Sequence, residues 1–144
     1  MINILTGIDS TSSALNAERI RMDVVSQNIA NVNTTRGPNG KPYQRQQVVF
    51  ESALKDQLKA GGPPGSSATV VNVARIESAN RAPRMVYQPG HADADKNGMV
   101  AMPNINIHEE MVDLMSSSRA YEANLNVVKT ARSMALQTLS IGKR

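Results

Sequence analysis

The feature that most constrains the fold is a C-terminal stretch with the pattern of one long helix. Residues 104–141 contain neither glycine nor proline. Their apolar residues recur at alternating steps of four and three, which places them on one face of an α-helix. That face holds Ile107, Met111, Leu114, Tyr121, Leu125 and Val128, with Ser118 as its polar member, and then slips to Val127, Ala131, Met134 and Ile141. At 1.5 Å per residue the helix would be roughly 50 Å long, so it needs a long partner.

The ends of this helix carry matching signals. Asn106 followed by Glu109 predicts a capping pair that satisfies free backbone N–H groups at the start. Acidic residues fill the first turns and basic residues follow the last, which complements the helix dipole.

The N-terminal residues supply the long partner. Residues 3–33 carry a heptad pattern in two interleaved series: Ile8, Leu15, Met22 and Ile29, and Ile4, Thr11, Glu18, Val25 and Val32. The polar residues 9–13 either cap a start near residue 9 or allow the first turns to fray. Short polar side chains at 31–34 predict the end of the helix. We therefore predict a mainly α fold in which the two terminal helices form an antiparallel, coiled-coil-like pair.

The middle of the chain differs from both ends in its proline and glycine content. All seven prolines and seven of the nine glycines lie between residues 36 and 103, so long helices are excluded there. Strands are predicted at 44–50, 68–76, 84–87 and 99–102, a short helix at 51–59 and a flexible tip at 60–67. The sequence thus divides into an N-terminal helix with its Asn-rich turn (1–35), a Pro/Gly-rich β-hairpin insert (36–103) and a C-terminal helix (104–144).

Composition and charge exclude several classes of protein. The chain has 144 residues, no cysteine and no continuous apolar run of membrane-spanning length. Its N-terminus lacks the basic and apolar regions of a cleaved secretion signal. The net charge of +4 arises entirely from residues 36–90, which carry eight basic and three acidic groups. These groups are scattered and have almost no aromatic residues beside them, so they indicate a solvated surface and not a nucleic-acid site.

Two groups of residues resemble chemical sites, but neither has a complete pattern. Residues 93–98, Asp-Ala-Asp-Lys-Asn-Gly, match the opening of a calcium loop, yet Asn104 stands where a bidentate Glu is required. We expect an Asp/Asn/Gly turn before a strand. His91 and His108 have no partners at metal-ligand or catalytic spacing. We therefore predict no catalytic residue, no metal site and no cofactor.

The asparagines near the end of the first helix allow two interpretations. Asn28, Asn31 and Asn33 either terminate the helix only or use their amides to bridge neighbouring subunits.

Both ends of the chain resemble the signatures of a known protein family. Residues 26–34, Ser-Gln-Asn-Ile-Ala-Asn-Val-Asn-Thr, resemble the N-terminal signature of the rod and hook proteins of the bacterial flagellum, and residues 110–131 resemble their C-terminal signature. Nearly the whole chain is similar to the proximal-rod members of the family. One departure is that residues 35–42 intervene before Tyr43, where the family signature continues directly into Pro-Gly-Tyr.

The resemblance implies a non-enzymatic axial subunit of the basal-body rod. Such a subunit would pass through the flagellar type III export apparatus without a cleaved signal peptide. It would then polymerise in the periplasmic space with copies of itself and other rod proteins, as a driveshaft that transmits motor torque. The predicted subunit interface comprises Ile8, Leu15, Met22, Val25, Asn28, Ile29, Asn31, Asn33, Met111, Leu114, Tyr121, Leu125 and Val128. The alternative is a soluble coiled-coil adaptor or export chaperone, which would stay unassembled in sedimentation across a concentration series.

Overall fold

The computed structural model describes residues 4–55 and 68–141 of the chain. Helix α1 (Ile4–Ala30) is followed by strands β1 (Gln46–Lys55), β2 (Ala68–Ser78), β3 (Arg84–Tyr87) and β4 (Met99–Met102), and by helix α2 (Ile107–Ile141). The strands form two antiparallel two-stranded sheets, β1–β2 and β3–β4. The predicted mainly helical fold with strands between two terminal helices is confirmed.

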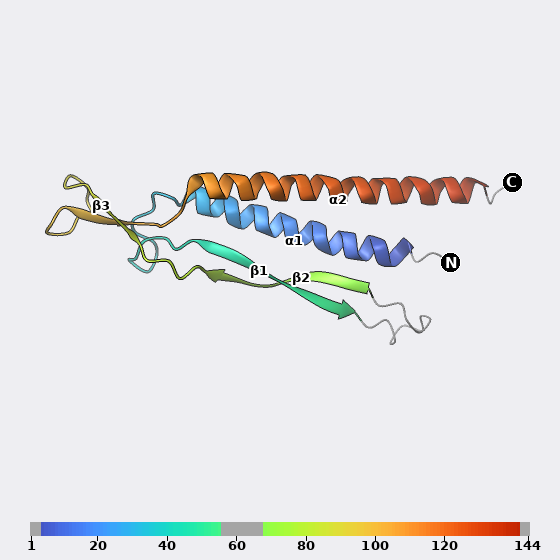
Figure 1. Ribbon diagram of the computed structural model, residues 1–144, viewed down its shortest axis with the longest axis horizontal. Coiled ribbons are helices and arrows are strands. Elements are labelled where there is room, and N and C mark those ends of the chain that lie inside the picture. Colours follow the sequence, from blue (N-terminus) through green and yellow to red (C-terminus); the bar gives the residue numbers. More distant parts are fainter. Residues whose placement is uncertain (1–3, 56–67, 142–144) are drawn as a thin grey trace.

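The molecule is elongated, with α1 as its middle layer. Helices α1 and α2 lie side by side and run in opposite directions, while the β1–β2 hairpin lies along another side of α1 (Figure 1). The β3–β4 hairpin extends beyond the helices, at the end of the molecule opposite the two termini. A two-stranded hairpin is marginal by itself, so β1–β2 depends on its packing against α1.

Helix α1 ends at Ala30, directly before the polar residues 31–34 from which its end was predicted. Asn31 donates a side-chain hydrogen bond to the carbonyl of Gln27 (2.9 Å), and its Oδ1 accepts one from Thr34 Oγ1 (3.1 Å). At the other end, the hydroxyl of Thr11 donates to the carbonyl of Gly7 (2.7 Å) inside the helix. Hydroxyl residues that bond back to the preceding turn are compatible with a helix interior. The helix therefore continues through residue 9 and begins at Ile4.

Strand β1 is longer than predicted. Residues 51–55 pair with residues 68–72 of β2, so the short helix predicted from residue 51 is wrong within the described part of the chain. Pairing with the β-branched residues of β2 outweighs the weak helix propensity of this segment. Residues 56–59 of that helix and the predicted tip at 60–67 lie outside the described residues. The register shifts between Val49 and Phe50, which leaves Ala74 as the extra residue of a β-bulge.

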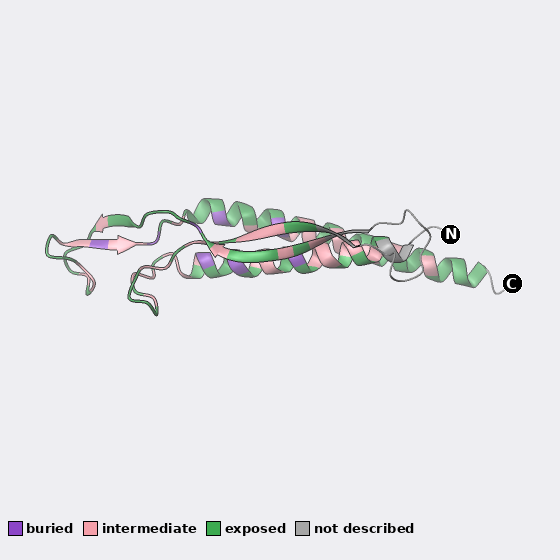
Figure 2. Cartoon of the chain, turned by 90° about the horizontal axis from the view of Figure 1, so that it is seen from below, coloured by how far each residue is buried: buried purple, intermediate pink, exposed green. Residues whose placement is uncertain are grey.

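The buried core is thin. The buried apolar residues in the described regions are Ala17, Val24, Val25, Ala79, Val100 and Pro103, and Figure 2 shows that buried positions are few and separated. Large apolar side chains remain exposed on α2, namely Ile107, Met111, Val112, Met115, Val127, Met134, Leu136, Leu139 and Ile141. None of the described helices is long and apolar enough to cross a membrane. The single chain thus leaves much apolar helix surface without cover.

The side of α2 that is least exposed follows one continuous four-three spacing. We call it the inner stripe: Glu110, Leu114, Ser117, Tyr121, Asn124, Val128, Ala131 and Ala135, all buried or half-buried. The predicted face shares Leu114, Tyr121 and Val128 with it. Of the residues predicted after the slip, Ala131 belongs to the inner stripe, whereas Val127 and Met134 are about half exposed (55% and 54%) on a different side of the helix. At 100° per residue, positions 127 and 134 lie far around the helix from 128 and 135.

Candidate functional site

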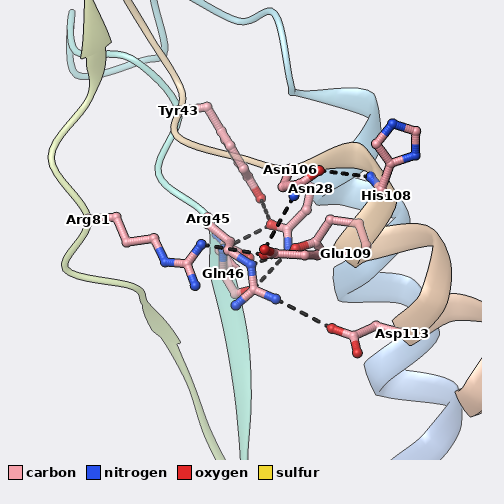
Figure 3. A network of polar contacts seen from close by, with 10 residues as sticks. Asn28, Tyr43, Arg45, Gln46, Arg81, Asn106, His108, Glu109 and Asp113 are labelled. Carbon is pink, nitrogen blue, oxygen red and sulfur yellow. Dashed lines mark hydrogen bonds and ion pairs between the residues drawn. The ribbon is translucent and has the colours of Figure 1, made fainter.

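Side chains from separate segments meet where the end of α1 approaches the start of α2 (Figure 3). Asn28 comes from α1, Tyr43 and Arg45 from the following loop, Gln46 from the start of β1, and Glu110 from the first turn of α2. We call these five residues the junction cluster. The backbone carbonyl of Arg45 also accepts a hydrogen bond from Ala79 N (2.7 Å), which attaches the end of β2 to the cluster.

Asn28 is the centre of the junction cluster and is fully buried. Its Nδ2 donates to the Gln46 carbonyl (2.8 Å) and to Glu110 Oε2 (2.9 Å). Its Oδ1 accepts from Gln46 N (2.9 Å) and from the Tyr43 hydroxyl (3.1 Å). A primary amide has two donors and two acceptor positions, so every hydrogen-bonding position of Asn28 is filled inside the chain.

Glu110 is a charged side chain with no exposed surface. Its Oε1 accepts a hydrogen bond from Arg45 Nε at 2.5 Å, and its Oε2 accepts the one from Asn28. The Arg45 side chain is 15% exposed and also approaches Asp113 Oδ2 at 3.5 Å. Because both oxygens of the buried carboxylate have donors, the desolvation of Glu110 is compensated by a nearby charge and by hydrogen bonds.

The first turn of α2 is held by the predicted cap. The backbone N–H of His108 donates to Asn106 Oδ1 (3.1 Å), and Asn106 Nδ2 donates to Glu109 Oε1 (3.3 Å). Asn106 therefore occupies the N-cap position, and the capping pair is confirmed. Glu109 also approaches Arg81 at 3.6 Å on the surface, which links the cap to the segment before β3.

Burial and the charge of the junction cluster both change the pKa of Tyr43. Burial, and then the negative charge of Glu110, raise the pKa of the Tyr43 phenol above its ordinary value. The phenol therefore stays protonated and can donate to Asn28. An acidic group whose pKa is raised by folding stabilises the fold at pH values below its unfolded pKa, and this contribution disappears as the pH rises through the folded pKa.

Tyr43→Phe tests this role. We expect a loss of about 0.5–1.5 kcal/mol in unfolding free energy at pH 8, because one net hydrogen bond is removed. The difference between the parent protein and the variant should shrink as the pH rises above about 10, the ordinary phenol pKa. Urea unfolding at pH 8 and at pH 10.5–11 measures both effects. A difference that stays constant across this range would contradict the protonated-donor role.

The structure distributes the predicted interface residues over several environments. Val25 is buried, Met111 is 48% exposed and Asn33 is exposed, while the members that are half-buried are Ile8, Leu15, Met22, Ile29, Asn31, Leu114, Tyr121, Leu125 and Val128. Asn31 bonds to its own helix end. The Asn28 amide is buried and bonded within the chain, so it has no free position for bridging in this structure, and the contact of the predicted residues with neighbouring subunits stays a prediction.

Four members of the junction cluster were missed in the sequence: Tyr43, Arg45, Gln46 and Glu110. Glu110 carried a signal, because it stands four residues before Leu114 and seven before Ser117, a position of the inner stripe. A carboxylate in a contact stripe requires a partner. Tyr43 and Arg45 gave no comparable signal, because their place follows from the path of the loop after α1.

Residues 93–98, which resembled the opening of a calcium loop, form a turn, whereas His108 lies in the first turn of α2. Asp95 Oδ1 accepts hydrogen bonds from the backbone N–H groups of Asn97 (2.8 Å) and Met99 (2.9 Å), and Gly98 adopts a left-handed φ of 74°. Asp93 accepts a hydrogen bond from Thr35 Oγ1 at 2.8 Å. The predicted turn before a strand is thus confirmed. Within residues 4–55 and 68–141, no three His, Cys, Asp or Glu side chains gather in a way that could hold a metal ion.

Models of known protein families match both ends of the chain. A family model described as the C-terminal part of flagellar basal body rod FlgEFG proteins matches residues 96–141, and one described as flagella basal body rod protein matches residues 8–38. The chain is 39% identical over 140 residues to the flagellar basal-body rod protein FlgC of Salmonella typhimurium, covering 97% of this chain and 98% of that protein. It is 40% identical to FlgC of Borreliella burgdorferi over 154 residues (97% and 98%) and to FlgC of Bacillus subtilis over 147 residues (94% and 96%).

Proposed function

The chain belongs to the FlgC family of flagellar basal-body rod proteins, and from this premise we propose how it assembles and what it transmits. It is a structural subunit of the proximal rod of the flagellar basal body. In that rod it packs against further copies of itself and other axial proteins, and the resulting shaft carries motor torque through the periplasmic space. The subunit reaches this place through the flagellar type III export apparatus.

The observation that carries the assembly proposal is the uncovered apolar surface of α2. Val112, Val127, Met134 and Ile141 are all more than half exposed. Val127, Met134 and Ile141 are seven residues apart, and Val112 is fifteen residues, about four turns, before Val127. All four therefore lie near one side of α2, which is distinct from the inner stripe. A surface helix of a self-sufficient domain has one apolar stripe, and a helix that is apolar on further sides is typical of a multi-helix assembly.

The division of the chain fits this role. Residues 1–35 and 104–144 form the axial part, and their two helices pair in the manner of an antiparallel coiled coil. The four-three spacing of the inner stripe supports this pairing. Residues 36–103 form the insert, whose β3–β4 hairpin lies at the far end of the molecule. Of the predicted interface residues, Met111 remains a direct candidate for contact with a neighbouring subunit.

Val127→Asp tests the assembly proposal. Val127 is exposed in the single chain, so the change should leave the unfolding free energy within about 0.5 kcal/mol. In an assembled rod the new carboxylate would be buried without a partner, which costs several kcal/mol per contact. We expect a strain that carries only this variant to be non-motile in soft agar and to lack completed rods, while still exporting the protein.

Asn126→Asp provides the matched control, because it adds a carboxylate to the adjacent exposed position. We expect near-normal swimming from this variant. Normal swimming of the Val127→Asp strain would remove this side of α2 from the rod interface. Failure of both variants would point to a general effect of charge on export.

A further inference from the structure

The contacts between α1 and α2 contain little that could define how far one helix slides along the other. In the inner stripe, Leu114, Tyr121 and Val128 lie one heptad apart, and the alternate positions hold the small or polar residues Ser117, Asn124 and Ala131. A slip of seven residues would set apolar against apolar again. Coiled coils with such repetitive stripes need a specific polar contact to select one register.

Glu110 is the position that breaks this repetition. It occupies the same stripe position as Ser117, and both residues are fully buried. In contrast to Glu110, whose oxygens bind Arg45 and Asn28, the Ser117 hydroxyl has no hydrogen-bond partner within the described residues. The carboxylate at position 110 therefore has a defined place along α1, whereas Ser117 fits any small gap.

The partners of Glu110 are fixed to α1. Asn28 is part of that helix, and it binds both the N–H and the carbonyl of Gln46, the residue next to Arg45. A slip of seven residues in one direction would set Ser117 opposite Asn28. In the other direction it would move Asn28 past Ile107, where α2 begins. Either slip breaks the Asn28–Glu110 bond and separates the buried carboxylate from its guanidinium.

We infer that Asn28, Arg45 and Glu110 act as a register key that selects a single axial alignment of α1 and α2. Their role is positional: a buried polar contact adds little net stability over an apolar one, but it makes every other alignment unfavourable. A second consequence rests on the proposed function: in a rod built from many similar helices, the key also keeps α1 with the α2 of its own chain.

The test measures helix alignment in the free full-length chain, so it does not depend on rod assembly. The chain has no cysteine, so spin labels can be attached at Asp23→Cys and Ser133→Cys, both of which are exposed. Because Asn28 lies at the level of Glu110, these positions are separated by about 27 Å along the helix axis. Double electron–electron resonance should give one narrow distance population in the parent protein. A broad distribution there would contradict the inference.

Removal of the key should create a second alignment. In the variant with Asn28→Leu, Arg45→Met and Glu110→Met, we expect retained helical circular dichroism and an added population displaced by about 10 Å along the axis, one heptad. Ser117→Ala is the control, because it changes the equivalent stripe position without touching the key, and its distribution should match that of the parent.

A milder variant covers the case in which the triple variant loses its helical signal. Glu110→Gln keeps the side-chain volume but removes the charge and replaces one carboxylate oxygen by an NH2 donor, so it cannot accept from Asn28 and Arg45 at the two separate positions of the carboxylate oxygens. We expect a broadened distribution from it. A distance distribution identical to that of the parent, in whichever of the two variants remains helical, would show that the apolar stripes alone set the register and would overturn the inference.

Discussion

Arg45→Ala should lower the unfolding free energy of the chain by about 3–5 kcal/mol, because it leaves a buried carboxylate without its counter-charge. Glu110 has no exposed surface, and Arg45 Nε is the donor to its Oε1. After the substitution only the Asn28 amide would remain as a partner. Since domains are stable by about 5–15 kcal/mol, this loss is a large fraction of the total. Urea denaturation followed by circular dichroism measures it.

Asp113→Asn is the matched control, because Asp113 pairs with the same arginine from the surface. Its side chain is 52% exposed and lies 3.5 Å from Arg45 Nη2. An exposed ion pair contributes at most about 1 kcal/mol, so this variant should unfold close to the parent midpoint. Equal losses in the two variants would mean that Glu110 is hydrated in solution and that the junction cluster is open.

Val24→Asp should separate the β1–β2 hairpin from α1. Val24 is 4% exposed and, with Gln46 and Val48 of β1, lines a cavity of about 200 Å³ between helix and strand. An aspartate there loses the apolar contacts of Val24 and buries a carboxylate, whose desolvation is offset only in part by Arg21 and Arg45, which line the same cavity. Because a two-stranded hairpin is marginal without a covering helix, the strands should lose protection together with the contact. Hydrogen exchange at the backbone amides of β1 and β2 measures this loss.

Asn16→Asp serves as the control for this experiment, because it adds the same charge to an exposed position of the same helix. It should leave the protection of the strand amides unchanged. If Val24→Asp also left them protected, the hairpin would be stable without α1, and the middle layer of the fold would not be needed to hold it.

The sequence alone determined the elements with strong local signals. The absence of glycine and proline from 104 to 141 defines α2, and Asn106 with Glu109 caps it as predicted. The short polar residues after Ala30 end α1. Each signal acts within about one helical turn or along one face, so it can be recognised without knowledge of the fold. The same local signals, together with the two terminal signatures, were sufficient to indicate the family.

The tertiary structure alone decided the junction cluster and the faces of the helices. Residues 51–55 became strand because β2 lies beside them, and no local pattern recorded that neighbour. Asn28 turned inward because Gln46, Tyr43 and Glu110, distant in sequence, meet its amide. The inner stripe of α2 passes through Glu110 and Ser117 and not through Met111. Hydropathy ranks side chains by their own preference for water, whereas burial depends on which partners the fold brings within bonding distance, and in this chain it includes the polar side chains of Asn28, Glu110 and Ser117.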